Sequence, residues 1–171
     1  MTHKKKRHII SLLVENKFGV LAKVAGLFSI RGYNIDSFSV GPTDDPTISR
    51  MTVVVHGDER TVEQITKQLN KLIDVVTVRV PSEQKHIEKE LCLMRVHTSS
   101  KRRTEVTHLA EIAGARIIDV RAASLLLEVL DTEDKVTQFI ELMKPFGIQE
   151  IARSGTVALS NPDNAHTSSD Q

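Results

Sequence analysis

Aromatic residues and cysteine are scarce in this sequence, which has no tryptophan, one tyrosine, five phenylalanines and one cysteine in 171 residues. A single cysteine cannot form an intramolecular disulfide, so Cys92 fits a protein of a reducing compartment. RNA-binding folds with a four-stranded sheet stack bases on aromatic rings of their central strands. The residues expected on the central strands here include Leu12 and Val53, which are aliphatic and cannot stack bases. The formal net charge of +1 gives no broad field for nucleic acid or an anionic membrane.

Long hydrophobic runs are also missing near the N-terminus. The apolar stretch at residues 9–14 is followed at once by Glu15, and it is too short for a signal-peptide core or a membrane span. The basic residues 4–7 fit a solvated terminus better than an arm that binds nucleic acid. We therefore expect a cytoplasmic protein with no membrane partner and no nucleic-acid partner.

Motifs of the common catalytic and cofactor sites are absent. The sequence has no Walker A loop, no G-x-G-x-x-G, no paired-cysteine zinc pattern and no H-E-x-x-H. Its seven histidines are scattered without the spacing of metal ligands. Cys92 shares a strand face with Met94 and Val96, which favours a buried structural thiol over a nucleophile. We expect no catalytic residue and no metal site in this chain.

Apolar periodicity divides residues 8–81 into four strands and two helices. We expect strands at 8–14, 33–41, 48–56 and 74–80, and helices at 20–31 and 61–72. Gly32 marks the end of the first helix, and Thr61-Val62-Glu63-Gln64 fits a capping box at the start of the second. This βαββαβ order is the split-βαβ, or ferredoxin-like, plait.

The same order restarts after a polar linker at residues 81–86. We expect strands at 87–97, 115–121, 124–130 and 147–159, and helices at 101–113 and 132–144. The fold class is therefore α+β, with two tandem ferredoxin-like βαββαβ plaits. Their expected bounds are 8–81 and 87–160, and residues 1–7 and 161–171 are expected to be disordered tails.

The first and third strands of this topology lie in the middle of the sheet, and both are apolar on two faces. In the first strand Ile10 and Leu12 alternate with Ile9 and Leu13. One face packs on the two helices, and the other needs cover from another domain or another subunit. We therefore expect the protein to associate.

The turn at residues 15–20 is the candidate binding site. Amides near Val20 and Leu21 lie at a helix N-terminus, where free N–H groups and the helix dipole suit a small carboxylate. Gly19 permits a positive φ or a close approach of a ligand. Asn16 offers both a donor and an acceptor, as an α-amino acid requires.

Asn34, at the start of the second strand, is placed to meet the same ligand across a subunit seam. Val20, Leu21 and Ile35 would then form a small apolar pocket. In the alternative interpretation, Asn16 and Gly19 only form a tight turn and Asn34 merely follows the end of a helix. The residues alone favour neither interpretation.

The segment Leu13–Leu21, together with residues 31–35 and 42–50, resembles the small regulatory subunit of acetolactate synthase (acetohydroxyacid synthase). The resemblance continues at residues 62–65, 68–69, 117–120 and 151–155, and it covers about residues 8–160. The half at 8–81 is similar to an ACT domain, a module that pairs side by side and binds amino acids at the seam.

This resemblance implies a non-catalytic subunit that activates a large catalytic subunit and makes it sensitive to feedback inhibition by valine, in the synthesis of valine, isoleucine and leucine. Thiamine diphosphate, magnesium and FAD are then expected in the large subunit, and no cofactor in this chain. It also implies a homodimer whose effector site combines two chains. That site would contain Asn16, Gly19, Val20 and Leu21 of one chain and Asn34 and Ile35 of its neighbour. Valine, leucine and isoleucine all remain candidate effectors, and both the second half and the Thr43–Arg50 loop are candidate contacts of the large subunit.

Two other function classes are compatible with a plait. A small acyl phosphatase needs an arginine-bearing phosphate cradle after the first strand, and residues 15–19 contain no arginine. A free-standing amino-acid-binding ACT protein could regulate another enzyme or transcription. A transcription regulator would require a helix-turn-helix segment, and we expect no helices outside the two plaits.

Overall fold

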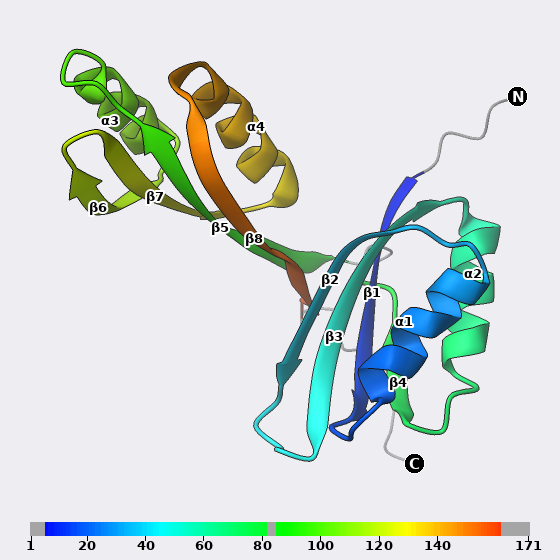
Figure 1. Ribbon diagram of the computed structural model, residues 1–171. Coiled ribbons are helices and arrows are strands. Elements are labelled where there is room, and N and C mark those ends of the chain that lie inside the picture. Colours follow the sequence, from blue (N-terminus) through cyan, green and yellow to red (C-terminus); the bar gives the residue numbers. More distant parts are fainter. Residues whose placement is uncertain (1–5, 82–84, 162–171) are drawn as a thin grey trace, which may run out of the picture. The chain divides into compact units, whose positions relative to one another are not determined.

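The computed structural model describes residues 6–81 and 85–161 and contains the expected order of elements twice (Figure 1). The first half consists of β1 (Lys6–Glu15), α1 (Val20–Ile30), β2 (Ile35–Pro42), β3 (Ile48–Gly57), α2 (Glu59–Leu69) and β4 (Val75–Arg79). The second half consists of β5 (His86–His97), α3 (Arg103–Ile112), β6 (Arg116–Arg121), β7 (Ser124–Asp131), α4 (Glu133–Met143), the 3₁₀ helix η2 (Lys144–Phe146) and β8 (Ile148–Ser160).

Each half forms a four-stranded sheet with two helices on one face (Figure 1). The strand order is β2-β3-β1-β4 in the first sheet and β6-β7-β5-β8 in the second. β3 is antiparallel to both β1 and β2, and β7 is antiparallel to both β5 and β6. The prediction of two ferredoxin-like plaits is confirmed, with the first and third strands of each half in the middle of its sheet.

The core of the first half lies between its sheet and α1 and α2. It is built from alternate residues of the central strands and one face of each helix, as the periodicity predicts. Its fully buried members are Ile10, Leu12, Val14, Val20, Val24, Phe28, Met51, Val53, Val55, Ile65 and Leu69. α1 ends where predicted, because Gly32 adopts φ +68° and the N–H of Tyr33 returns to the carbonyl of Phe28 at 3.0 Å.

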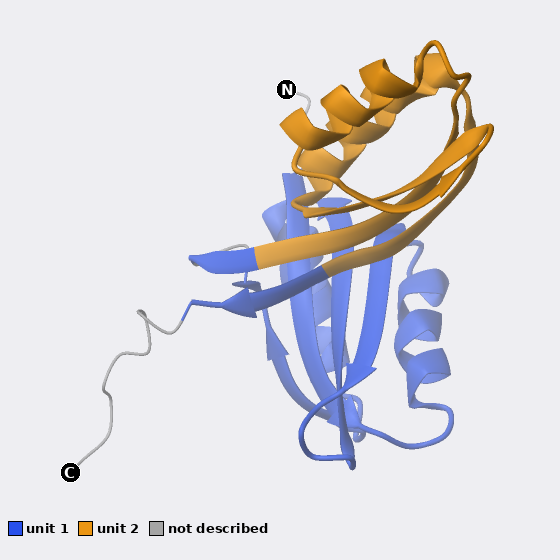
Figure 2. Cartoon of the chain, turned by 90° about the vertical axis from the view of Figure 1, so that its left-hand side faces the viewer, with its two compact units in different colours: residues 1–87, 157–171 blue, residues 88–156 orange. Residues whose placement is uncertain are grey.

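The opposite face of the first sheet is apolar at its centre. Ile9 and Val54 are register partners on β1 and β3, both are completely buried, and they pack with Ala158 of β8. Two compact units make up the chain, residues 1–87 with 157–171 and residues 88–156 (Figure 2). Ala158 belongs to the first unit, so the end of the last strand contributes to the core of the first half.

The second half has its own core between its sheet and α3 and α4. The buried residues alternate along β5 and β7 in the same way as in the first half. They are Cys92, Met94, Val96, Val106, Ala110, Leu125, Leu127, Val129, Val136, Phe139, Met143 and Phe146.

Two local predictions are wrong. α2 begins at Glu59 instead of 61, because the Asp58 carboxylate caps the helix by accepting a hydrogen bond from the Thr61 N–H at 2.7 Å. The capping box at Thr61 therefore does not form. Lys6 and Arg7, expected in a disordered tail, belong to β1, where they lie opposite Gly57 and His56 of β3. Asn161, also expected in a tail, donates its N–H to the Lys85 carbonyl at 2.9 Å. The other expected tail residues, 1–5 and 162–171, and the linker residues 82–84 lie outside the described residues.

Candidate functional site

The loop between β1 and α1 presents an uncapped helix N-terminus. Gly19 is the N-cap residue of α1 with φ +83° and ψ −11°, no side chain caps the helix, and its first turn has no acidic residue. The N–H of Val20 is bonded to the Lys17 carbonyl at 3.3 Å. In the described part of the chain, the N–H groups of Leu21 and Ala22 have no acceptor. These donors and the helix dipole favour an anionic group at this point.

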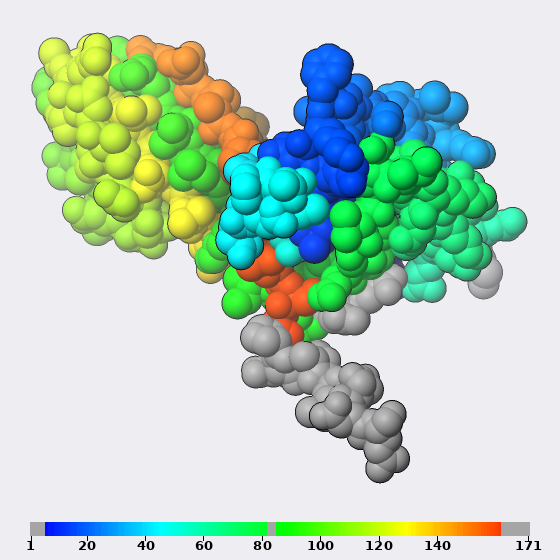
Figure 3. Space-filling view, turned by 90° about the horizontal axis from the view of Figure 1, so that it is seen from below, coloured from blue at the N-terminus to red at the C-terminus, as the bar shows by residue number. Residues whose placement is uncertain are grey.

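Asn16 joins this loop to the loop between β2 and β3. Its Nδ2 donates to the Pro46 carbonyl at 2.9 Å, and its backbone N–H donates to the Thr47 carbonyl at 2.7 Å. Figure 3, viewed from this end of the first unit, shows the cyan β2–β3 loop beside the blue β1–α1 loop. The carboxamide therefore has a structural partner, and among the described residues its Oδ1 acceptor and its second N–H have none.

The β2–β3 loop is itself ordered by its side chains. The Asp45 carboxylate accepts hydrogen bonds from the Thr47 hydroxyl at 2.7 Å and from the Thr47 N–H at 2.8 Å. These hydrogen bonds lower the pKa of Asp45, which therefore stays ionised at neutral pH. Asp45 thus stabilises the loop whose Pro46 and Thr47 carbonyls accept hydrogen bonds from Asn16.

The apolar side chains in and near the candidate site differ in their exposure to solvent. The side chain of Val20 is buried in the core of the first half, so only its backbone is available to a ligand. Leu21 is about half exposed and Phe18 is fully exposed. Phe18 is not among the predicted site residues, although its position in the loop was visible in the sequence.

Asn34 and Ile35 lie at the other end of the same sheet. Ile35 pairs with Val55 of β3, and Val55 is also the register partner of His8 near the start of β1. Asn16, in contrast, follows Glu15 at the end of β1. The seven residue steps from His8 to Glu15 correspond to roughly 23 Å along the strand. A single chain therefore does not bring Asn34 together with Asn16, Gly19 and Leu21.

The side chain of Asn34 is held by its neighbours. Its Nδ2 donates to Asp36 Oδ1 at 3.1 Å, and Asp36 Oδ2 lies 2.7 Å from His56 Nδ1. Ile35 is partly buried against the core of the first half. Sequence reasoning identified Asn34 but missed Asp36 and His56, because the pairing of β2 with β3 that brings these two together is not a local feature.

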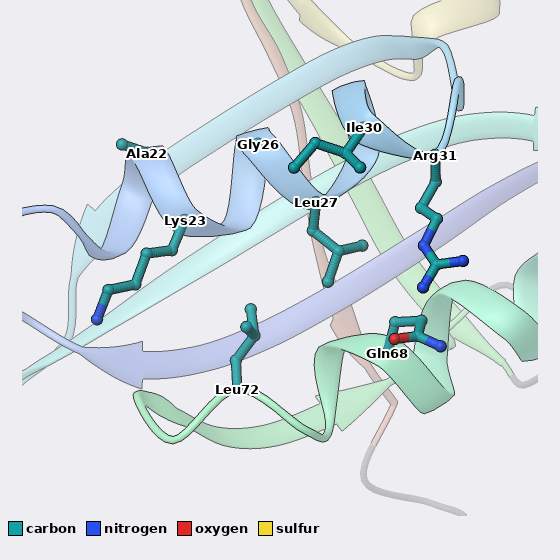
Figure 4. A pocket seen from close by; sticks show the side chains of 8 residues that line it. All are labelled: Ala22, Lys23, Gly26, Leu27, Ile30, Arg31, Gln68 and Leu72. Carbon is teal, nitrogen blue, oxygen red and sulfur yellow. The ribbon is translucent and has the colours of Figure 1, made fainter.

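A groove lies on the helical layer of the first unit, between α1 and the end of α2. This groove has a volume of about 480 Å³, and Figure 4 shows Leu27 and Leu72 pointing toward each other across it. Lys23, at one end, is paired with Asp74 at 2.6 Å, and Arg31 extends beside Gln68 at the other. The lining offers apolar contact and cations but no acid–base pair or nucleophile.

The second half contains a buried ion pair with a structural role. Glu90, whose side chain is 3% exposed, accepts two hydrogen bonds from Arg153, at 2.9 and 2.7 Å. This pairing raises the pKa of Arg153. Burial, the largest influence, raises the pKa of the neighbouring Cys92 thiol, so the thiol is protonated at neutral pH and is a poor nucleophile.

The described residues contain no group of three or more His, Cys, Asp or Glu side chains that could hold a metal ion. None of the helices in residues 6–81 and 85–161 has the length and apolar character needed to cross a membrane.

Comparison with known proteins identifies both halves of the chain. The model of the AHAS small subunit-like ACT domain matches residues 10–77, and the family described as the small subunit of acetolactate synthase matches residues 89–162. The probable acetolactate synthase small subunit of Archaeoglobus fulgidus is 52% identical over 153 residues, which cover 90% of this chain and 96% of that protein.

Further relatives agree with this match. The acetolactate synthase isozyme 3 small subunit of Escherichia coli is 45% identical over 158 residues, covering 92% of this chain and 97% of its own length. The crystal structure of the acetolactate synthase small subunit from Thermotoga maritima superimposes with a TM-score of 0.84 at 40% identity, covering 91% of this chain and 98% of that one.

Proposed function

We propose a specific regulatory role for this chain, which belongs to the acetolactate synthase small-subunit family. It binds valine, or a related branched-chain amino acid, and transmits this binding to a large catalytic subunit that it also activates. Valine, as an end product, then inhibits the enzyme that begins its synthesis. The observation that carries the proposal is the uncapped N-terminus of α1 in the loop that follows Asn16, where the N–H groups of Leu21 and Ala22 have no acceptor among the described residues.

Residues 8–81 are proposed to be the effector-binding and dimerising ACT domain, and residues 87–160 the second domain. The dimer would form by antiparallel pairing of two β2 strands, because β2 is an edge strand of the first sheet. The start of β2 in one protomer would then lie beside the end of β2 in its partner. That end leads directly into the loop to which Asn16 is bonded.

This arrangement explains why the candidate residues are split between the two ends of one sheet. Asn16, Gly19, Val20 and Leu21 of one protomer would meet Asn34 and Ile35 of its partner. The free N–H groups of α1 would bind the carboxylate of the amino acid, the carboxamides would bind its polar groups, and the exposed Leu21 side chain would contact its isopropyl group. Each dimer would contain two such sites, related by the two-fold axis.

The catalytic step is assigned to the large subunit, which would hold thiamine diphosphate, magnesium and FAD. This chain would contribute no cofactor and no catalytic residue, in line with the protonated Cys92 thiol. A single buried cysteine also suits the reducing cytoplasm, where we place the complex. A free-standing regulator of another enzyme or of transcription is less favoured, since both halves match the acetolactate synthase family.

Regulation by valine requires only a modest coupling energy. Suppose that valine stabilises one arrangement of the paired ACT domains and that the large subunit prefers another. A coupling of about 1–3 kcal/mol between the two then changes the affinity for the large subunit by roughly 5–150-fold when valine binds. A few hydrogen bonds and the burial of an isopropyl group provide energies of this order. Because coupling is reciprocal, binding of the large subunit must weaken valine binding by the same factor.

A mixed dimer tests the two-chain site. Asn16→Ala and Asn34→Ala should each abolish valine binding in a homodimer. If each site takes Asn16 from one protomer and Asn34 from the other, a mixed dimer of the two variants has one intact site and one doubly altered site. Titration calorimetry should then find about half of the wild-type valine sites.

Two outcomes would refute the proposal. A mixed dimer with no valine site would mean that both residues act within one chain. An acetolactate synthase assay of the large subunit with the Asn16→Ala chain provides the functional comparison. Unchanged inhibition by valine in that assay would exclude the β1–α1 loop as the effector site.

A further inference from the structure

The carboxamide of Asn34 has a defined orientation, set by a chain of two hydrogen bonds. Asn34 Nδ2 donates to Asp36 Oδ1 at 3.1 Å, and Asp36 Oδ2 is 2.7 Å from His56 Nδ1. Both oxygens of the carboxylate are therefore engaged. The Asp36 side chain is 27% exposed and that of His56 is 45% exposed, so this network lies at the surface of the first unit.

The strands of the sheet bring these three residues together. Asn34 and Asp36 flank the start of β2, where the pairing with β3 shifts register between Ile35 and Ser37. Such a bulge re-aims the side chains around it. His56 lies on β3, and its register partner on β1 is Arg7. Asp36 thus faces a histidine of the adjacent strand and the amide of Asn34.

An ionised carboxylate can only accept hydrogen bonds, and this fixes which end of the amide faces it. Asn34 must turn its NH₂ group toward Asp36, so its Oδ1 oxygen points away as a hydrogen-bond acceptor. An acceptor at this position suits the ammonium group of an amino acid and not a carboxylate. The N–H groups at the start of α1, from the partner protomer, are donors and suit the opposite end of the ligand.

We infer that Asp36, held in place by His56, is a positioning residue that makes the effector site select for an α-amino group. This inference rests on the proposed function. It predicts that the site discriminates valine from acids of the same carbon skeleton in which an oxo or hydroxyl group replaces the amino group. Feedback would then respond to the amino acid and not to its 2-oxo precursor.

The test is Asp36→Asn, because an asparagine side chain can donate to Asn34 Oδ1 and allow the Asn34 amide to turn over. Titration calorimetry on the full-length dimer compares valine with its 2-hydroxy analogue. We expect valine to bind about tenfold more weakly, as for the loss of one charge-assisted hydrogen bond. The hydroxy analogue should bind at least as well as before, so that the ratio of the two affinities falls.

Three further variants separate positioning from a purely structural effect. His56→Gln keeps a side-chain N–H donor for Asp36 and should retain the wild-type affinity ratio, whereas His56→Leu should lower it. Glu63→Gln removes the same charge as Asp36→Asn from an exposed ion pair with Lys67 on α2, and it should leave both affinities unchanged. The urea midpoint of each variant without ligand measures its folding stability. If Asp36 had only a structural role, its substitution would lower this midpoint without changing the ratio of the affinities for valine and its 2-hydroxy analogue.

The outcomes distinguish this inference from the proposed function. If the wild-type protein binds no valine, the proposed function fails and the inference fails with it. If the wild type binds valine and Asp36→Asn keeps the wild-type ratio, the effector site stands and Asp36 does not orient Asn34.

Discussion

Gly19 provides the most direct test of the loop that presents the α1 N-terminus. Its φ of +83° lies in the left-handed region, which costs a residue with a Cβ roughly 1–2 kcal/mol. A Cβ built at Gly19 meets no other atom within 4 Å, so Gly19→Ala introduces backbone strain without a steric clash. Alanine also restricts the unfolded chain, which offsets about 0.4–1 kcal/mol of that strain. We expect a net loss of about 1 kcal/mol in the free energy of unfolding.

Gly26 is the matched control, because it lies within α1 and its φ is not in the left-handed region. A Cβ at Gly26 also meets nothing within 4 Å. Since glycine is a poor helix former, Gly26→Ala should stabilise the protein by about 0.5–1 kcal/mol. The same substitution should thus have opposite signs at the two glycines. Gly19→Asn should fall closer to the wild type, because asparagine tolerates the left-handed region.

Urea unfolding followed by circular dichroism measures these stabilities, and titration calorimetry measures valine binding to the same variants. Any relaxation of the strained loop in Gly19→Ala turns the N–H groups of Leu21 and Ala22 away from the ligand. Valine should therefore bind more weakly to Gly19→Ala than to Gly26→Ala. If Gly19→Ala is as stable as Gly26→Ala and binds valine equally well, the loop does not need its positive φ and the reasoning is refuted.

Other predictions concern the packing and charges of the two halves. Asp58→Ala should lower the free energy of unfolding by about 1 kcal/mol through loss of the α2 cap, and Asp58→Asn should restore most of it in urea unfolding. Arg153→Leu should lower the free energy of unfolding by about 3–5 kcal/mol, because it leaves the nearly completely buried Glu90 carboxylate unpaired. Glu90→Leu should cost less, because the Arg153 side chain is 35% exposed and can turn to water. Equal losses would contradict this prediction. Asp131 has its pKa lowered from 3.8 to about 2, chiefly by its hydrogen bond from Lys89, so its stabilising effect is complete above pH 3.8 and is lost as the pH falls toward 2. Asp131→Asn should remove this part of the acid dependence, as measured by urea midpoints at pH 5 and pH 3.

The local elements were predictable because each depends on residues close together in the sequence. Alternating apolar residues located the central strands, and Gly32 located the end of α1. The start of α2 was misjudged because both Asp58 and Thr61 are good N-cap residues. Only the backbone geometry, in which Asp58 is extended and its carboxylate reaches the Thr61 N–H, decides between them.

The candidate site was predictable in its residue types but not in its contacts. The sequence cannot show that the Asn16 amide is partly used by the Pro46 carbonyl, because that contact depends on the path of a distant loop. Nor can it show that Asp36 and His56 meet beside Asn34. The position of Asn34 at the opposite end of the sheet follows from the topology, and that separation is what makes a second protomer necessary to the proposed site.

The burial of Ile9 and Val54 by Ala158 has a consequence for biosynthesis. Ile9 and Val54 belong to the first plait, whereas Ala158 follows Val54 by 104 positions in the sequence and is synthesised later. A nascent chain therefore folds its first plait with two bare aliphatic side chains, and exposed apolar surface of this kind favours aggregation. Synthesis of the last strand, and not completion of the first plait, is what allows this face to be covered.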